Sequence, residues 1–266
     1  MWTWFSALSF AGMLAVTFVA LAVWSVASSA LGFAIERSAF GRSHRVFDVP
    51  LGDGQYTREI KGYVGFLVIH AIGFPALIQV GLLQGGGSGL LNFALTFFAS
   101  YLCFESSYFL LHRVMHHPKL LWTHRFHHLS RVTTPLTGLS VHPAEAIGWV
   151  VCLSLGPLLL SLFGPFHFGA WVAYLGYNFG GNIIGHANAE FFPQSWFRTR
   201  AVSAFAQPVI CHALHHARWN GHYGFASMKY DRATGSEMSD WRALHARVAS
   251  GIPMMSLRET GESRET

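Results

Sequence analysis

The chain has 266 residues, of which 52% are hydrophobic and only 12% are charged. Soluble domains usually carry about 25% charged residues, so this composition indicates that lipid faces much of the surface. The formal charge of +5 at pH 7 does not favour a nucleic-acid-binding protein, because the arginines are scattered between apolar stretches.

Five apolar stretches have about the 20 residues that a membrane-spanning helix needs. The first, from about residue 4 to 33, carries no charge, lacks a basic segment before it and is too long for a signal peptide, so we interpret it as a retained helix. The fifth is polar for a span, which indicates burial inside a helix bundle. The other four spans form two hairpins with turns at 85–89 and at Gly164–Pro165, and they are predicted over residues 64–84, 89–111, 146–164 and 166–185.

These spans would return residues 35–63, 112–145 and 186–266 to one side of the membrane. All 18 lysines and arginines lie in these three segments, and the opposite side receives none. Because cytoplasmic loops carry an excess of Lys and Arg, we predict that the shared side is the cytoplasm. The expected fold is an all-α integral membrane protein with four to five transmembrane helices in two hairpins and a cytosolic helical cap.

Histidine is unusually frequent, with 16 residues, and most of these fall on the predicted cytoplasmic side in patterned groups. Residues i, i+3 and i+4 share one face of a helix, so the motifs HxxxH and HxxHH direct several imidazoles at one point. One such motif is often a solvated or core histidine, but three on one membrane face favour a metal site. The groups are His112, His116 and His117; His124, His127 and His128; and His212, His215 and His216.

Three single histidines are further candidates. His186 lies where the fifth span reaches the cytoplasmic side, and we expect it to be a ligand. His142 precedes Pro143, a residue that suits a first helical turn, so helix capping competes with ligation there. His222 lies between glycines and is either a ligand or a turn residue. The others are expected to be polar bundle or turn residues (His70, His167) or solvated (His44, His245).

The number of imidazoles predicts two metals with four or five nitrogen ligands each, because a tetrahedral zinc takes four ligands at most. The cysteines Cys103, Cys152 and Cys211 form no CxxC pair and indicate neither a disulfide framework nor a thiolate site. Glu105 lies seven residues before His112, two turns along the same helix face. An acid inside a span suggests a functional role, and we expect Glu105 to orient a histidine, with a plain buried hydrogen bond as the alternative.

The motifs and their order along the chain resemble those of the fatty acid hydroxylase and sterol desaturase superfamily of membrane di-iron enzymes over roughly residues 98–236. The resemblance implies two irons, O2 as co-substrate and electrons from an external cytochrome b5, ferredoxin or reductase. His222 stands where many relatives have asparagine or another residue. The motifs that carry the resemblance are Glu105, Tyr108, His112-Arg113, His116, Trp122, His124, His127-His128, His142-Pro143, Glu145, His186, Asn188, His212, His215-His216, Gly221-His222-Tyr223-Gly224, Asp231-Arg232 and Gly235.

The resemblance implies an oxygenase that hydroxylates or desaturates an unactivated C–H position of a lipid taken from the bilayer, such as a sterol, a fatty acyl chain or a related amphiphile. The alternative is a membrane metal-binding or metal-transport protein without oxygenase activity. A zinc protease is disfavoured because no HExxH occurs. We expect an N-terminal helix and linker (1–63), the di-iron membrane domain (64–236) and a cytosolic tail (237–266).

Overall fold

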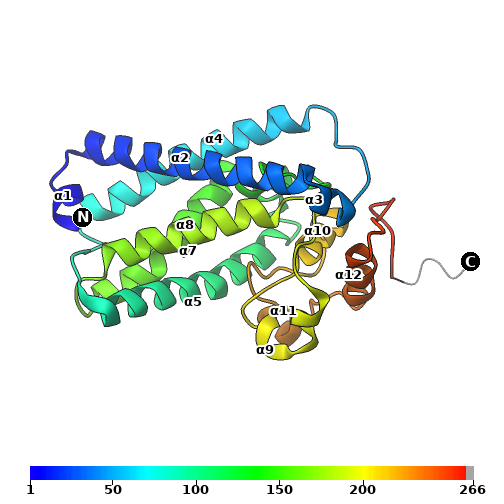
Figure 1. Ribbon diagram of the computed structural model, residues 1–266. Coiled ribbons are helices and arrows are strands. Elements are labelled where there is room, and N and C mark those ends of the chain that lie inside the picture. The colour runs from blue at the N-terminus through cyan, green and yellow to red at the C-terminus, as the bar shows by residue number, and fades with distance from the viewer. Residues whose placement is uncertain (262–266) are drawn as a thin grey trace, which may run out of the picture.

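The computed structural model describes residues 1–261, and its regular structure over these residues is entirely helical (Figure 1). The prediction of an all-α protein is confirmed. The helices of the membrane bundle are α1 (Trp2–Ser6), α2 (Phe10–Arg37), α4 (Gln55–Gln79), α5 (Gly89–Met115), α7 (Pro143–Ser161) and α8 (Phe168–Gly185). The remaining elements are α3 (Ala39–Ser43), η1 (Leu121–Thr123), α6 (Arg125–His128), η2 (Thr137–Leu139), η3 (Gln194–Arg198), α9 (Arg200–Ser203), α10 (Val209–Arg218), α11 (Lys229–Thr234) and α12 (Trp241–Ala249).

Four helices, α2, α4, α5 and α7, are long and apolar enough to cross a membrane. The fifth long helix, α8, packs against α2 and α5 and buries Asn178 and Asn182. With these polar residues, α8 is not among the four helices that are apolar enough to count as candidate spans. The chain is therefore a multi-pass membrane protein. The predicted burial of the fifth helix holds for one of its faces only, because Val172 and Tyr177 on α8 remain 43% and 47% exposed.

The two predicted hairpins, α4–α5 and α7–α8, both turn at the end of the bundle that lies away from the cap (Figure 1). Their turns are bonded to each other, since Gly87 N donates to Phe166 O at 2.9 Å and Phe166 N donates to Gln84 O at 3.0 Å. This pairing holds the hairpins in register. All the segments that carry patterned histidines consequently emerge together at the opposite end.

Two helix starts differ most from the prediction. The first apolar stretch is broken into α1 and α2, because the Ser9 side chain accepts a hydrogen bond from Gly12 N at 3.2 Å and starts a new helix. Helix α4 begins at Gln55, nine residues before the predicted span. Its polar first turns bury Gln55 and Glu59 beneath the cap, so hydropathy alone did not reveal them.

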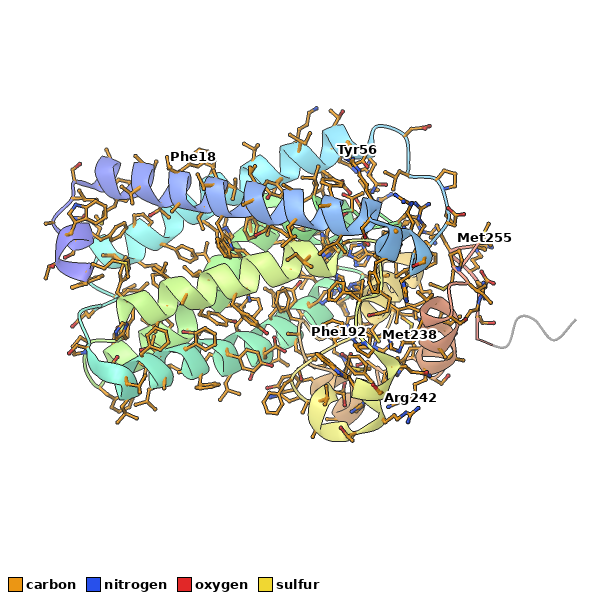
Figure 2. All side chains as sticks on the ribbon, in the orientation of Figure 1. Phe18, Tyr56, Phe192, Met238, Arg242 and Met255 are labelled. Atoms are coloured by element: carbon orange, nitrogen blue, oxygen red, sulfur yellow. The ribbon has the colours of Figure 1, made fainter. Side chains whose placement is uncertain are left out.

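The segments 44–54, 116–142 and 186–261 form a cap over one end of the bundle. Apolar side chains project from the outer faces of the bundle, whereas nitrogen- and oxygen-bearing side chains gather at the cap end (Figure 2). The cap has its own core, in which Phe47 and Trp241 are buried. His245 is also buried there, at 1% exposure, and the prediction that it is solvated was wrong because α12 folds back onto the cap.

Glu59 on α4 ties the bundle to the loop that follows α6. Its carboxylate accepts hydrogen bonds from the hydroxyls of Ser130 (2.7 Å), Thr134 (2.7 Å) and Thr137 (2.6 Å), and from Gln55 Nε2 (2.8 Å). All five side chains are buried. Because a buried carboxylate needs such donors, this network fixes the path of the loop directly behind the histidines of α6.

Candidate metal centre

Short helical segments bring nine histidines together where the bundle meets the cap. His112 lies in the last turn of α5 and His116 caps that helix, while His186 caps α8. The nine histidines form two groups. Within each group, the potential ligand nitrogens lie within 4.8 Å of one another. The five-histidine group contains His112, His116, His124, His128 and His215, and the four-histidine group contains His127, His186, His212 and His216.

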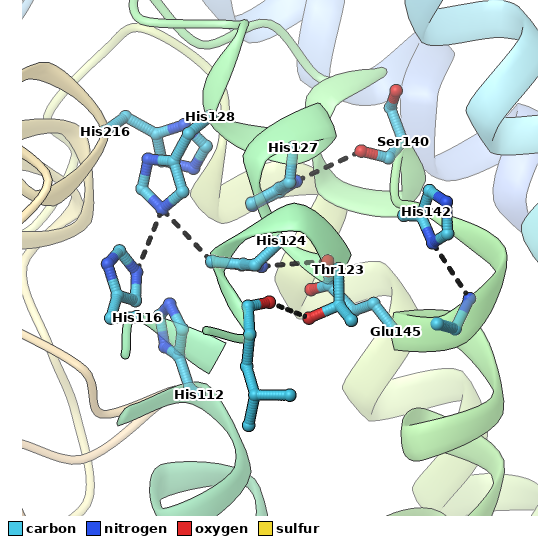
Figure 3. A network of polar contacts seen from close by, with 12 residues as sticks. His112, His116, Thr123, His124, His127, His128, Ser140, His142, Glu145 and His216 are labelled. Atoms are coloured by element: carbon cyan, nitrogen blue, oxygen red, sulfur yellow. Dashed lines mark hydrogen bonds and ion pairs between the residues drawn. The ribbon is translucent and has the colours of Figure 1, made fainter. Parts of the chain in front are cut away.

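The Nε2 atoms converge inside the five-histidine group. His128 Nε2 lies 3.2 Å from His116 Nε2 and 3.1 Å from His124 Nε2 (Figure 3). Metal–nitrogen bonds of about 2.0–2.1 Å place adjacent ligand nitrogens about 2.9–3.4 Å apart, depending on the coordination geometry. The observed separations are therefore those of imidazoles that share one ion.

The four-histidine group has the same geometry. His212 Nε2 lies 2.9 Å from His186 Nε2 and 3.2 Å from His216 Nε2. The two groups adjoin, because the ring centroids of His128 and His216 are 4.8 Å apart. The arrangement thus offers two neighbouring metal positions.

The other ring nitrogen, Nδ1, faces an acceptor in most of these histidines. An Nδ1–H donor leaves a lone pair on Nε2, which is the form that a metal ligand needs. In most cases the acceptor is a backbone carbonyl. The pairs are His112 with Tyr223 O (2.9 Å), His124 with Glu145 Oε2 (2.8 Å), His127 with Ser140 O (3.2 Å), His186 with Asn182 O (2.7 Å), His215 with Gly221 O (2.7 Å) and His216 with Ser130 O (2.9 Å).

This tautomer pattern fits bound cations. The Nε2 atoms of His186 and His216 carry lone pairs, and both atoms lie close to His212 Nε2. A single proton on His212 Nε2 could form a hydrogen bond to only one of the two. The Nε2 atoms of His112 and His215 are buried and have no hydrogen-bond partner among the described residues. A metal ion in each group would satisfy these nitrogens together.

Burial also keeps the imidazoles uncharged. It lowers the pKa of His127 to about 3, with a further contribution from His186, and the pKa of His186 to about 4. Burial likewise lowers the pKa of His128 and His216 well below the ordinary value. Neutral rings are ready to bind metal at pH 7 without first losing a proton.

Three of the predicted ligands lie outside both groups. His117 is exposed and its Nδ1 accepts a hydrogen bond from Lys119 N at 3.3 Å. His142 caps α7, with its Nδ1 accepting from Ala144 N at 3.2 Å, which is the capping alternative considered above. His222 is buried, and its Nε2 accepts from Met238 N at 3.3 Å.

The carboxylate that bonds to one of the nine clustered histidines among the described contacts is Glu145, not Glu105. Among the described contacts, Glu105 Oε1 accepts from Ala226 N at 3.2 Å, which matches the buried hydrogen-bonding alternative. Glu145 lies in the first turn of α7 and belongs to the motifs that carry the family resemblance, but the sequence alone assigned it no role. The backbone carbonyls that accept from Nδ1 have no sequence signal at all.

Comparison with known proteins agrees with this centre. The family model for fatty acid hydroxylase matches residues 97–236, just over half of the chain. Protein CER1-like 2 of Arabidopsis thaliana is 33% identical over 141 residues, covering 51% of this chain and 23% of the relative. The very-long-chain aldehyde decarbonylase GL1-6 of Oryza sativa subsp. indica is 30% identical over 150 residues, covering 55% and 24%.

The match thus spans about a quarter of the length of these curated relatives. No solved structure matches the chain significantly. The family-model match covers α8, α10 and the segments that hold all nine clustered histidines. The chain belongs to the fatty acid hydroxylase family.

Proposed function

We propose that this protein is a membrane di-iron oxygenase that hydroxylates or desaturates an unactivated C–H position of a lipid. The observation that carries the proposal is the pair of adjoining groups of four and five histidines. Nitrogen-rich sites of this kind suit iron as well as zinc or copper, and membership of the family favours iron. We propose the nine clustered histidines as the ligands, without His117, His142 and His222.

The irons, when bound, would supply the O2 chemistry. In hydroxylation, the C–H bond becomes C–OH, and the second oxygen atom leaves as water with two electrons and two protons from a donor protein. In desaturation, two hydrogen atoms leave the lipid, the donor protein again supplies two electrons that are accompanied by two protons, and both oxygen atoms become water. We propose cytochrome b5, ferredoxin or a reductase as the electron donor.

The protein itself would hold the ligands and exclude water. The acceptors at Nδ1 hold each ring in one orientation, which makes Nε2 a better ligand. A cavity of 390 Å³ reaches His186 and His212, and Phe191, Phe192 and Phe225 contribute to its apolar wall. A lipid segment in this cavity would lie beside the four-histidine group with bulk water displaced.

A lipid substrate is supported by the position of this cavity beside α8, a helix of the membrane bundle. The names of several relatives point to very-long-chain aldehydes as one substrate class to test. We further propose that the centre faces the cytoplasm, because the basic residues gather at the cap end.

Metal analysis and Mössbauer spectroscopy of protein purified without oxygen test the proposal. We expect about two irons per chain, lost in His127→Ala and His215→Ala and retained in His117→Ala, which changes an exposed histidine. A single zinc in protein from iron-replete cells would contradict it. Two irons without O2 uptake in the presence of reductant and candidate lipids would instead favour the alternative of a metal-binding or transport protein.

A further inference from the structure

The two histidine groups differ in what covers them. The cavity of 390 Å³ reaches the four-histidine group at His186 and His212, and no member of the five-histidine group lines it. The five-histidine group is covered instead at the end of α10, where the ring centroid of Trp219 lies 4.9 Å from that of His128. Trp219 is only partly buried. Its indole therefore connects this group to the surface of the cap.

Trp219 has a backbone conformation that bulky residues rarely adopt. It caps the C-terminus of α10 with a φ of 68° and a ψ of 8°, in the left-handed region that favours glycine and asparagine. Ending the helix therefore does not account for an indole at this position. Strained residues of this kind concentrate at functional sites. The ring that Trp219 covers is also unusual, because His128 Nδ1 is buried without a hydrogen-bond partner among the described residues.

The surface beside Trp219 is basic. Arg125 lies one turn before His128 on α6, and Arg131 lies three residues after it. Arg131 Nη2 donates to Ala217 O at 2.6 Å, two residues before Trp219. Residues 112–142 contain no Asp or Glu, and their basic side chains are exposed and form no salt bridge among the described residues. These side chains are Arg113, Lys119, Arg125 and Arg131. A surface with this charge is complementary to an acidic protein.

We propose that the Trp219 surface, made of Trp219, Arg125 and Arg131, is the docking site of an acidic one-electron carrier protein, and that the Trp219 indole passes electrons to the five-histidine group. The proposal rests on the proposed function for the need for electrons and adds the place where they enter. Each transfer oxidises the carrier by one electron and reduces one metal ion by one electron, with no net change in the indole. Two transfers supply the two electrons of one turnover.

This arrangement would separate the two tasks of the centre. The lipid would lie in the cavity beside the four-histidine group, while electrons arrive at the five-histidine group from the other molecule. Electron transfer slows steeply when a gap opens between the groups that exchange the electron. A ring in contact with His128 removes such a gap, and its exposed edge is available to a partner.

Charge tests the docking. The iron-loaded protein in detergent is titrated with the soluble haem domain of cytochrome b5 and, separately, with an acidic ferredoxin. We expect weaker binding of at least one carrier at about 0.15 M than at about 0.01 M salt. Arg125→Glu should raise its Kd about tenfold, whereas Arg198→Glu, the same change at an exposed residue of η3, should not. Equal effects of the two variants, or no binding of either carrier, would overturn the docking site.

Anaerobic stopped-flow mixing of the reduced carrier with the ferric protein tests Trp219. Asparagine suits the left-handed region, so Trp219→Asn should keep its iron and its unfolding midpoint but lose most of the transfer rate at saturating carrier. Trp219→Tyr keeps an aromatic ring and should retain more of that rate. Trp122→Asn changes a tryptophan that is 58% exposed and contacts His142, and it should transfer normally. An unchanged rate in Trp219→Asn would rule out the indole as the route.

Reduced methyl viologen separates this proposal from the proposed function. As a small cation it needs no docking site, so it should reduce the iron of every variant. Iron that methyl viologen reduces but neither carrier does would overturn the docking site and leave the proposed function standing. Transfer through Trp219 without O2 uptake in the presence of candidate lipids would count against the proposed function alone. Loss of copurifying phosphatidylglycerol in Arg125→Glu, with carrier binding unchanged, would assign the basic residues to lipid headgroups and contradict the proposal.

Discussion

His124 Nδ1 donates a hydrogen bond to Glu145 Oε2 at 2.8 Å, and both side chains are fully buried. The pair joins the segment before α6 to the first turn of α7, 21 residues away in the chain. A carboxylate at Nδ1 orients the ring and raises the electron density at Nε2, the atom that would face the metal. Glu145 therefore supports the candidate metal centre although it does not belong to either histidine group.

Replacing Glu145 by glutamine should weaken iron binding by about 10- to 100-fold, because the amide no longer carries the negative charge that makes His124 a stronger ligand. Titration with a chelator, followed by iron analysis, measures this change. Glu105→Gln is the matched control, since its carboxylate contacts Ala226 N and no histidine among the described contacts. Equal iron loss in both variants would contradict this role of Glu145, because it would show that both carboxylates affect iron binding only through the stability of the fold.

His142→Ala should lower stability by about 1 kcal/mol and leave the iron content unchanged, because its side chain caps α7. His128→Ala should remove iron, because its Nε2 lies close to two other Nε2 atoms. Thermal unfolding in detergent and iron analysis of the same samples separate the two effects. Iron loss in His142→Ala would restore His142 as a ligand candidate.

Glu59→Ala should destabilise the protein by about 3 kcal/mol or more, because four buried donors lose their common acceptor. Gln55→Ala removes one of these donors and should have a smaller effect. The midpoint of thermal unfolding measures both. Since the loop behind α6 depends on Glu59, we also expect weaker iron binding in Glu59→Ala, and full iron occupancy would contradict that link.

Glu190 should make stability depend on pH. Burial raises its pKa from 4.5 to about 7, although the amides of Ile210 and Phe192 donate to it, and His245 Nε2 lies 3.8 Å away. Because the folded-state pKa is raised, the stabilisation from protonated Glu190 is full below about pH 4.5 and is lost as pH rises through about 7.

The variant Glu190→Gln should remove this component. Its stability relative to the wild type should rise by about 3 kcal/mol between about pH 5 and about pH 8. Taking the difference between the two proteins cancels the opposite contribution of buried histidines, whose lowered pKa values make the fold less stable in acid. Denaturation at several pH values measures it, and parallel curves for the two proteins would contradict the role of Glu190.

The sequence by itself determined the number of long helices, the two hairpins and the end of the bundle at which the histidines gather. Hydropathy over some 20 residues and the helical repeat are local properties, so they can be read without a structure. The spacing of His124, His127 and His128, and of His212, His215 and His216, similarly predicted which faces would meet.

Tertiary structure decided which group each histidine joins. His127 and His128 are neighbours in the chain but belong to different groups, and His215 joins histidines of α5 while His212 and His216 do not. It also decided that His142 caps a helix and that Glu145 holds His124. These features depend on the direction in which each side chain points once distant segments pack, which residue spacing along the chain does not contain.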